Sequence, residues 1–304
     1  MIYDMLIIGG GPGGYTAALY AARAGLSVAV LEKLSAGGQM AQTHQIDNYP
    51  GFPEGIDGFE LGERMQLQAE KFGAVTEYAD VSSMDLKADP KEVHSSEGTF
   101  YGRTVVIATG AGPKELGLPM ERELTGRGVA YCAECDGMFF KDKVVAVVGG
   151  GNSAAGDALL LSRVAKKVYL IHRRDTLRAE KITQKPLQEA DNVEFLLNST
   201  VTELLHDRKL TGIRVKDLVS GEEQELALDG LFISVGRKPA VGLVKDQLAL
   251  DPSGYILAGE DTKTSVPKVY AVGDVRSKPL RQIVTAVADG AVAVQMAQHF
   301  LAGD

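Results

Sequence analysis

The chain has 304 residues, which is enough for two domains of about 150 residues that each bury their own core. Hydrophobic residues make up 45% and charged residues 24% of the sequence, a composition that excludes a disordered or fibrous protein. The formal net charge of -8 makes the chain a poor candidate for binding nucleic acid or an anionic membrane surface.

The sequence also indicates the compartment. Its two cysteines are too few for a secreted disulfide scaffold. The N-terminus has no basic segment followed by a small-residue cleavage site, and no apolar run approaches the ~20 residues that span a bilayer. We therefore expect a cytoplasmic protein without a signal peptide.

The start of the chain predicts a strand, a glycine turn, a helix and a second strand. Residues 3–8 form an apolar run of strand length, and residues 9–14 form the turn. Residues 15–23 have a helical pattern, and residues 27–31 are a second apolar run that ends at Glu32. This order of elements is typical of a βαβ unit.

The same order recurs later in the chain, with a strand, a glycine turn, a helix and a strand at 143–148, 149–154, 155–163 and 167–171. Further strand-like runs lie at 104–108, 230–235 and 268–272, and residues 282–304 predict a helix that packs on the first domain. The fold class is therefore α/β, with two Rossmann-like nucleotide-binding domains.

Two breaks rich in Gly and Pro, at 110–113 and 236–240, are the plausible crossings between these domains. They predict a discontinuous first domain of residues 1–114 and 242–304. The second domain, residues 115–241, would be inserted into it.

The first glycine turn has the spacing of a dinucleotide-binding loop. Gly9, Gly11 and Gly14 fit G-x-G-x-x-G, in which glycine permits a tight turn, close approach to a pyrophosphate and close helix packing. Glu32, at the end of the second strand, can accept hydrogen bonds from a ribose 2′-OH, although it can also be a solvated charge.

The second turn has the variant G-x-G-x-x-A, at Gly149, Gly151 and Ala154. The position that matches Glu32 is His172, followed by Arg173, Arg174 and Arg178. Guanidinium groups suit a 2′-phosphate, so this site predicts NADPH, although such a cluster can also be a solvated cationic turn. FAD is the economical choice for the first site, and Asp274 after the 268–272 strand could bind its ribityl hydroxyls.

Cys132 and Cys135 have the spacing of a disulfide-exchange pair, and Asp136 follows them. Zinc would need about two more ligands, and the sequence has no further Cys and no tight His pair, so we expect no metal site. A structural thiol pair remains open, but a redox-active disulfide beside the flavin fits best. Asp136 could transfer a proton there or act as a helix N-cap.

Together these residues resemble the low-molecular-weight thioredoxin reductases. The resemblance covers essentially the whole chain, and the pairing of Cys-x-x-Cys-Asp-Gly with His-Arg-Arg-x-x-x-Arg is its most specific part. It implies a homodimeric enzyme that passes electrons from NADPH to FAD, to the disulfide and then to thioredoxin. It also implies that Cys135 faces the flavin, that Cys132 attacks thioredoxin, and that the inserted domain rotates about hinges near 112–113 and 239–240.

The resemblance further implies the cofactor-binding residues. The FAD site would include Gly9, Gly11, Pro12, Gly14, Glu32, Gly38, Gln39, Asn48, Ala108, Thr109, Gly110, Gly273, Asp274, Arg281 and Gln282. The NADPH site would include Gly149, Gly151, Asn152, Ser153, Ala154, His172, Arg173, Arg174 and Arg178.

The sequence departs from the family pattern in two segments. Gly156 and Asp157 stand where the family usually has an acidic pair, and Gly156 should weaken its helix by roughly 1 kcal/mol relative to Ala. The lost acidic side chain could alter the placement of the nicotinamide. Glu134, between the cysteines, adds a negative charge that disfavours a nearby thiolate.

Three other functions fit parts of the pattern. A related flavoprotein could take electrons from reduced ferredoxin, or use a thioredoxin-like acceptor, but the ferredoxin-driven relatives lack the arginine cluster. A ferredoxin- or flavodoxin-NADP reductase would not need the cysteine pair. A non-enzymatic flavin redox sensor would need only one nucleotide site.

Overall fold

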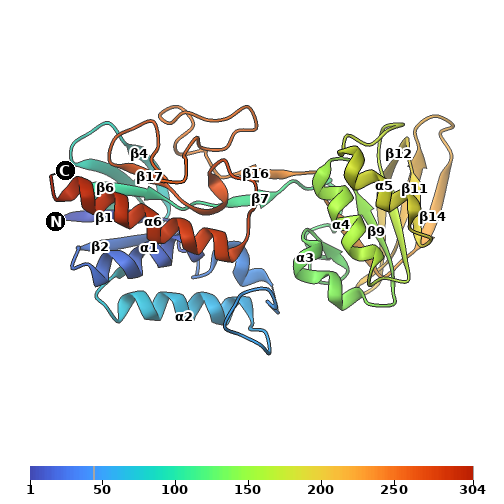
Figure 1. The fold of residues 1–304 in the computed structure, drawn as a ribbon, viewed down its shortest axis with the longest axis horizontal. Helices are drawn as coiled ribbons and strands as arrows, with labels where there is room; N and C mark the ends of the chain where they lie inside the picture. The colour runs from blue at the N-terminus through green and yellow to red at the C-terminus, as the bar shows by residue number, and fades with distance from the viewer. Residues whose placement is uncertain (44, 304) are drawn as a thin grey trace. The chain divides into compact units, whose positions relative to one another are not determined.

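The computed structural model describes residues 1–43 and 45–303, and the chain divides into two compact units. Unit 1 comprises Met1–Gly112 and Lys238–Asp304, and unit 2 comprises Pro113–Arg237. At the boundary, the short strands β7 (Ala111–Pro113) and β16 (Arg237–Pro239) pair with each other. Each unit combines helices with a mainly parallel sheet (Figure 1).

In the described part of unit 1 the central sheet has seven strands. Five of them run parallel in the order β3-β2-β1-β6-β17, and the hairpin β4–β5 extends the sheet by antiparallel pairing with the first half of β6. The strands are β1 (Ile2–Ile8), β2 (Val28–Glu32), β3 (Val75–Tyr78), β4 (Val81–Asp85), β5 (Lys91–Ser95), β6 (Gly98–Ile107) and β17 (Val269–Ala271). Because β1 lies in the middle, its carboxyl end is the point where the strand order reverses, which is where doubly wound folds bind ligands.

Two helices cover one face of this sheet side by side: α1 (Pro12–Arg23) and α6 (Ile283–Leu301) (Figure 1). Small residues of both helices, Ala17 and Ala21 from α1 and Ala293 and Ala297 from α6, belong to one buried core cluster. The other helices of unit 1 are α2 (Gly58–Glu70) and the short 3-10 turns η1 (Gly38–Gln42) and η3 (Gly273–Val275).

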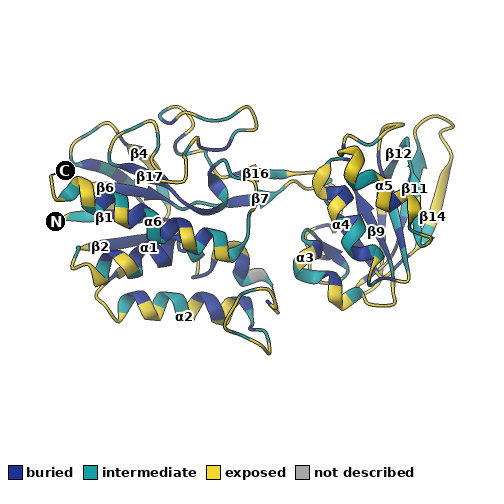
Figure 2. Cartoon of the chain, viewed as in Figure 1, coloured by how far each residue is buried: buried dark blue, intermediate teal, exposed yellow. Residues whose placement is uncertain are grey.

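The opposite face is covered without a long helix. Leu6, Leu31 and Ile107 of the sheet pack there against Val244 and Ile256 of the segment that precedes β17. Figure 2 shows the central strands of each sheet, such as β1 and β9, as mostly buried.

Unit 2 repeats this strand order. Its five-stranded sheet, within the described residues, is entirely parallel in the order β11-β10-β9-β15-β8 and carries a separate antiparallel meander, β12-β13-β14. The strands are β8 (Val129–Ala130), β9 (Val144–Val148), β10 (Lys167–Ile171), β11 (Val193–Leu196), β12 (Ser199–His206), β13 (Leu210–Asp217), β14 (Glu223–Ala227) and β15 (Gly230–Ile233). The helices are α3 (Ala133–Asp136), η2 (Gly137–Phe140), α4 (Asn152–Ser162) and α5 (Lys181–Glu189).

The predicted elements lie close to the observed ones, but both first helices begin three residues earlier than expected. Helix α1 begins at Pro12 and helix α4 at Asn152, so the last part of each glycine turn already belongs to the helix. Proline suits the first helical position because its fixed φ is that of a helix and the N–H it lacks would have no partner there. The C-terminal helix ends at Leu301, and residue 304 of the expected span lies outside the described residues.

None of the helices in the described ranges is both long and apolar enough to cross a membrane.

The packing of α6 on α1 generates a stability prediction. A Cβ on Gly290 would lie 2.4 Å from the Gly13 carbonyl oxygen and 2.9 Å from the Ala17 nitrogen, so G290A must push the helices apart. We expect a loss of about 1–3 kcal/mol in the free energy of unfolding, measured by urea denaturation followed by circular dichroism.

Gly156 provides the matched control, because it also lies inside a helix but a Cβ there would meet no described atom within 4 Å. G156A should therefore stabilise the protein by about 0.5–1 kcal/mol. If G290A were as stable as the unmodified protein, the close packing of α1 and α6 would be refuted.

Candidate functional site

The first glycine turn leaves open space in front of helix α1. Gly9 has a φ of +106°, and a Cβ there would lie 2.6 Å from the Ala108 carbonyl oxygen. A Cβ on Gly14 would lie 2.0 Å from the Gly9 carbonyl oxygen, whereas one on Gly11 would meet no described atom within 4 Å. Packing therefore requires glycine at the first and third positions, and the second leaves room for a ligand at the N-terminus of the helix.

The N-terminus of α1 is suited to bind an anion. Gly11 is the N-cap and has no side chain, so no side chain caps the first N–H groups of the helix. Unpaired N–H groups and the positive end of the helix dipole favour a phosphate at such a position. These residues therefore fit the pyrophosphate of a dinucleotide.

Glu32 is bound to the glycine turn itself. Its carboxylate accepts hydrogen bonds from the backbone nitrogens of Gly10 at 2.6 Å, Lys33 at 2.9 Å and Leu34 at 3.0 Å. A carboxylate has about four acceptor positions, so one remains for a ribose hydroxyl. Glu32 thus connects the end of β2 to the turn and is more than a solvated charge.

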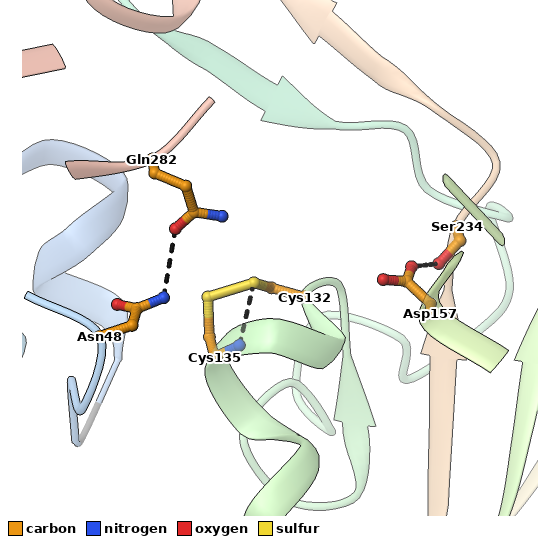
Figure 3. Close-up of a disulfide and its surroundings, with 6 residues drawn as sticks. All are labelled: Asn48, Cys132, Cys135, Asp157, Ser234 and Gln282. Atoms are coloured by element: carbon orange, nitrogen blue, oxygen red, sulfur yellow. Dashed lines mark hydrogen bonds between the residues drawn. A yellow bond between two sulfur atoms is a disulfide. The ribbon is translucent and has the colours of Figure 1, made fainter. Parts of the chain in front are cut away.

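The remaining residues predicted for the first site come from three loops of unit 1. Ala108 lies against Gly9, and Thr109 donates a hydrogen bond to the Ala240 carbonyl at 2.8 Å. Asn48 donates to the side-chain oxygen of Gln282 at 3.3 Å, a contact drawn in Figure 3. Gly38 and Gln39 lie in η1. Gly38 is close to the first glycine turn, because a Cβ on Gly38 would lie 3.6 Å from the Gly11 Cα.

The loop after β17 contains the other predicted residues. Gly273 and Asp274 lie in η3. The Arg281 guanidinium lies over the Tyr255 ring, 3.8 Å from its centroid, and donates to the carbonyls of Asp274 at 3.3 Å and Arg276 at 3.4 Å. Arg281 therefore fixes the loop in addition to any contact with a ligand.

Unit 2 repeats the geometry of the first turn. A Cβ on Gly149 would lie 2.4 Å from the Ser234 carbonyl oxygen and 2.7 Å from the Cβ of Ala154, whereas one on Gly151 would meet no described atom within 4 Å. Ser153 is exposed, but the Asn152 side chain accepts from the Glu180 backbone nitrogen at 2.8 Å and so binds the start of α5. The second turn also fits a dinucleotide.

The arginine segment is connected to this second turn. The backbone nitrogens of Arg178 and Ala179 donate to the Gly150 carbonyl at 2.6 and 3.1 Å, and the side chains of Arg173, Arg174 and Arg178 are exposed. The segment that carries the three arginines therefore follows β10 and is bound to the turn through its backbone. Exposed guanidinium groups there suit a phosphate on a nucleotide.

His172 lies beneath the turn and is 5% exposed. Its ring atoms would be 2.3–2.5 Å from a Cβ on Gly150, and its Nε2 has no hydrogen-bond partner among the described residues. Burial lowers the pKa of His172, and the charges of Arg178, Arg174 and Arg173 lower it further. The ring is therefore neutral at neutral pH and unsuited to pair with a phosphate as a cation.

Cys132 and Cys135 form a disulfide with a Cα–Cα distance of 5.3 Å (Figure 3). Cys132 is the N-cap of α3, and its Sγ accepts a hydrogen bond from the Cys135 backbone nitrogen at 3.2 Å. Both cysteines are half-buried, which leaves the disulfide accessible. After reduction, an N–H aimed at the Cys132 sulfur would stabilise a thiolate there.

Asp136 ends α3 and precedes η2, and its backbone nitrogen donates to the Cys132 carbonyl at 3.0 Å. It stands at the N-cap position of η2 without a side-chain capping bond to that turn. The capping role considered from the sequence is therefore not observed. Proton transfer at the sulfurs stays a prediction.

Asp157 forms a contact that the sequence did not indicate. The Ser234 hydroxyl at the end of β15 donates a short hydrogen bond to its carboxylate (Figure 3). Burial raises the pKa of Asp157, and the charge of Glu134 adds to the increase, while Ser234 and Arg237 oppose it. This carboxyl lies at the carboxyl edge of the unit 2 sheet, near the helix that carries the disulfide.

Residues 1–43 and 45–303 contain no group of three or more His, Cys, Asp or Glu side chains that could hold a metal ion.

Unit 1 contains a buried cluster of Arg276, Lys278 and Asp289 that was not predicted from the sequence. Its only signal in the sequence was Asp289, the one acidic residue of helix α6.

The chain is similar to known proteins over almost its whole length. The profile of the family described as pyridine nucleotide-disulphide oxidoreductase matches residues 3–290. The chain is 44% identical over 301 residues to the thioredoxin reductase of Bacillus subtilis (strain 168), covering 99% of this chain and 95% of that protein. It is 45% identical over 304 residues to the thioredoxin reductase of Streptomyces clavuligerus, covering 99% and 94%.

A solved structure is similar over the same length. The crystal structure of thioredoxin reductase from Streptococcus pyogenes MGAS5005 matches with a TM-score of 0.90 and 45% identity, covering 100% of this chain and 99% of that chain. This match confirms the predicted fold class of two Rossmann-like α/β domains, one inserted into the other.

The raised pKa of Asp157 predicts a pH dependence of stability. A carboxyl whose pKa is higher in the folded than in the unfolded state loses stability as the pH rises from its unfolded pKa through its folded pKa. D157N abolishes this loss, so its free energy of unfolding should rise relative to that of the unmodified protein between about pH 4 and pH 8. Urea denaturation across this range measures the difference.

Asp217 is the matched control in the same unit, because hydrogen bonds from the Ser220 and Val219 backbone nitrogens lower its pKa. Its contribution is present above the unfolded pKa and is lost as the pH falls, so D217N should show the opposite slope. If the change in unfolding free energy varied with pH in the same direction for D157N and D217N, the opposite pKa shifts of Asp157 and Asp217 would be refuted.

Proposed function

This chain belongs to the pyridine nucleotide-disulphide oxidoreductase family, and on that premise we propose that it is a thioredoxin reductase that moves electrons from NADPH through FAD and the Cys132–Cys135 disulfide to oxidised thioredoxin. The observation that carries the proposal is the accessible disulfide in the same unit as the second glycine turn and its arginine segment. A reductase needs an electron donor site, a flavin site and a disulfide, and the chain supplies residues suited to each.

FAD, when bound, accepts a hydride equivalent from NADPH and delivers two electrons to the disulfide. In unit 1, the N-terminus of α1 would bind its pyrophosphate, Glu32 a ribose hydroxyl, and Asp274 the ribityl chain. In unit 2, the N-terminus of α4 would bind the NADPH pyrophosphate, and Arg173, Arg174 and Arg178 the 2′-phosphate. The open space at Gly11 and Gly151 supports both assignments.

The reduced cysteine pair then exchanges with the protein substrate. The Cys132 thiolate attacks one sulfur of the thioredoxin disulfide, which forms a mixed disulfide and releases one thioredoxin thiolate. The Cys135 thiolate attacks the Cys132 sulfur, which restores the Cys132–Cys135 disulfide and releases the second thiolate. Asp136 would exchange the accompanying protons with the cysteine pair.

The surface beside the disulfide suits a protein substrate. Met138 is 63% and Phe139 48% exposed in η2, directly after the helix that carries Cys135. Neighbouring exposed apolar side chains are a feature of sites that contact another protein. By the same resemblance we propose a homodimer in the cytoplasm, and the presence of only two cysteines supports that compartment.

Anaerobic mixing of the FAD-loaded protein with NADPH tests the proposal. The flavin absorbance should bleach, and subsequent addition of oxidised thioredoxin should restore it. A protein that binds no flavin, or whose flavin NADPH does not reduce, would refute the proposed electron path. Bleaching by reduced ferredoxin instead would identify the alternative donor.

The roles of the two sulfurs lead to a prediction. C132S should reduce thioredoxin turnover to the background rate, because the sulfur assigned to attack thioredoxin is removed, while NADPH-dependent reduction of ferricyanide continues. C135S keeps that nucleophile and should accumulate a stable mixed disulfide with thioredoxin, measured by non-reducing electrophoresis and mass spectrometry.

Trapping by C132S and not by C135S would reverse the assignment. Full thioredoxin turnover by C132S would remove the disulfide from the mechanism altogether.

The arginine segment leads to a second prediction. Replacing Arg173 or Arg178 by Ala removes charge-assisted hydrogen bonds worth about 1.5–3 kcal/mol each, so KM for NADPH should rise roughly 10- to 100-fold. KM for NADH, which lacks the 2′-phosphate, should stay nearly constant. Steady-state kinetics with both coenzymes measure the change in preference.

R163A is the control, because Arg163 is also exposed in unit 2 but follows the far end of α4. It should alter neither constant. An equal loss with NADPH and NADH in R173A would show that the arginine has no role in recognising the 2′-phosphate.

A further inference from the structure

The buried carboxylate of Asp289 in unit 1 binds the loop of residues 273–282, which belongs to the proposed FAD site, at three residues. Asp289 of α6 is 5% exposed and accepts hydrogen bonds from the Gly273 backbone nitrogen at 2.8 Å and the Lys278 Nζ at 2.7 Å. Arg276, 4% exposed, donates to the same carboxylate through Nε at 2.9 Å and Nη2 at 2.6 Å. One carboxylate therefore accepts four hydrogen bonds, three at Oδ2 and one at Oδ1.

The two cations extend this cluster along the loop. Arg276 also donates to the Ala258 carbonyl at 3.2 Å, and Lys278 to the Thr285 carbonyl at 3.2 Å. Thr285 forms a capping box with Gln282 at the start of α6. The carboxylate thus anchors residues 273, 276 and 278 of the loop that contains Asp274, Arg281 and Gln282.

The same turn of α6 also touches the first glycine loop. Gly290, next to Asp289, lies against Gly13, whose carbonyl oxygen would be 2.4 Å from a Cβ on Gly290. Ala286 lies one turn earlier in α6 and is close to both loops. A Cβ on Gly273 would lie 3.5 Å from the Ala286 Cβ, and a Cβ on Gly13 would lie 3.1 Å from the Ala286 carbonyl oxygen. Helix α6 is therefore in contact with both the first glycine turn and the 273–282 loop. Asp289 connects the helix to the 273–282 loop through hydrogen bonds to its charged carboxylate.

We propose that Asp289 is a positioning residue for FAD, which holds the 273–282 loop in its binding conformation before the cofactor arrives. The proposal rests on the proposed function, because it assumes FAD at this site. A loop that is ordered in advance spares the cofactor the entropy cost of ordering it, so the affinity depends on the anchor although the anchor need not touch FAD. The cluster is costly to bury, and losing Asp289 leaves Arg276 and Lys278 buried without their anionic partner.

The test measures FAD binding to the apoprotein, which is prepared by removing the flavin. In D289N the dissociation constant, measured by quenching of FAD fluorescence, should rise roughly 10- to 100-fold, since hydrogen bonds to charged groups are lost. Hydrogen exchange of the apoprotein should accelerate in the peptide that covers residues 273–282. K278M, which keeps the Asp289–Arg276 pair, should show the same changes to a smaller extent and covers the case in which D289N fails to fold.

D4N is the matched control, because Asp4 also accepts hydrogen bonds from a backbone nitrogen, Ser27 at 3.0 Å, and from an arginine, Arg103 at 3.1 Å. It lies near the amino end of β1, whereas the glycine turn follows the carboxyl end. D4N should change the FAD dissociation constant less than about twofold, whatever its effect on stability.

Two results would overturn the proposal. One is a folded D289N or K278M apoprotein that binds FAD as tightly as the unmodified protein, and the other is a loss of affinity that D4N shares in proportion to its loss of stability. Neither affects the proposed function, which fails only if the unmodified apoprotein does not bind FAD or NADPH does not reduce it.

Discussion

The arrangement of both units depends on the contact between the first and last residues of a glycine turn. In unit 1 the Gly9 carbonyl oxygen would be only 2.0 Å from a Cβ on Gly14, so β1 can pass directly into α1 only when that Cβ is absent. In unit 2 Ala154 takes the place of Gly14, and a Cβ added to Gly149 would lie 2.7 Å from the Ala154 Cβ. The close approach points the uncapped N-terminus of each helix at the carboxyl edge of its sheet, where a dinucleotide phosphate is stabilised.

The sequence predicted the elements whose signals are local. A buried strand, a glycine turn and an alanine-rich helix follow one another within short segments, so β1, α1, β9 and α4 could be located from the chain alone. The hairpin β4–β5 and the meander β12-β13-β14 were not predicted, because strands such as β4 and β14 are mostly exposed, carry no continuous apolar run and depend on neighbours for pairing.

In the candidate sites, too, only the residues with a local sequence signal could be predicted. The glycines, cysteines and arginines were recognisable by spacing, whereas the side chains that hold them in place were not. Asp289 binds residues 273, 276 and 278 only because the loop folds back on α6, and Ser234 meets Asp157 only across the edge of the sheet. Such contacts are set by tertiary packing, and an isolated Asp in a sequence does not show which donors surround it.

The two turns differ most at the carboxyl end of the second strand of each βαβ unit, where Glu32 ends β2 and His172 follows β10. Glu32 binds the Gly10 nitrogen, and His172 packs against Gly150 at the corresponding place in unit 2. A carboxylate here repels a 2′-phosphate and accepts from a ribose hydroxyl. The His172 ring, neutral because burial and the neighbouring arginines lower its pKa, leaves the positive charge to side chains at the surface. One backbone geometry therefore suits two different nucleotides, because the side chain in contact with Gly10 is a carboxylate, whereas the one in contact with Gly150 is a neutral imidazole.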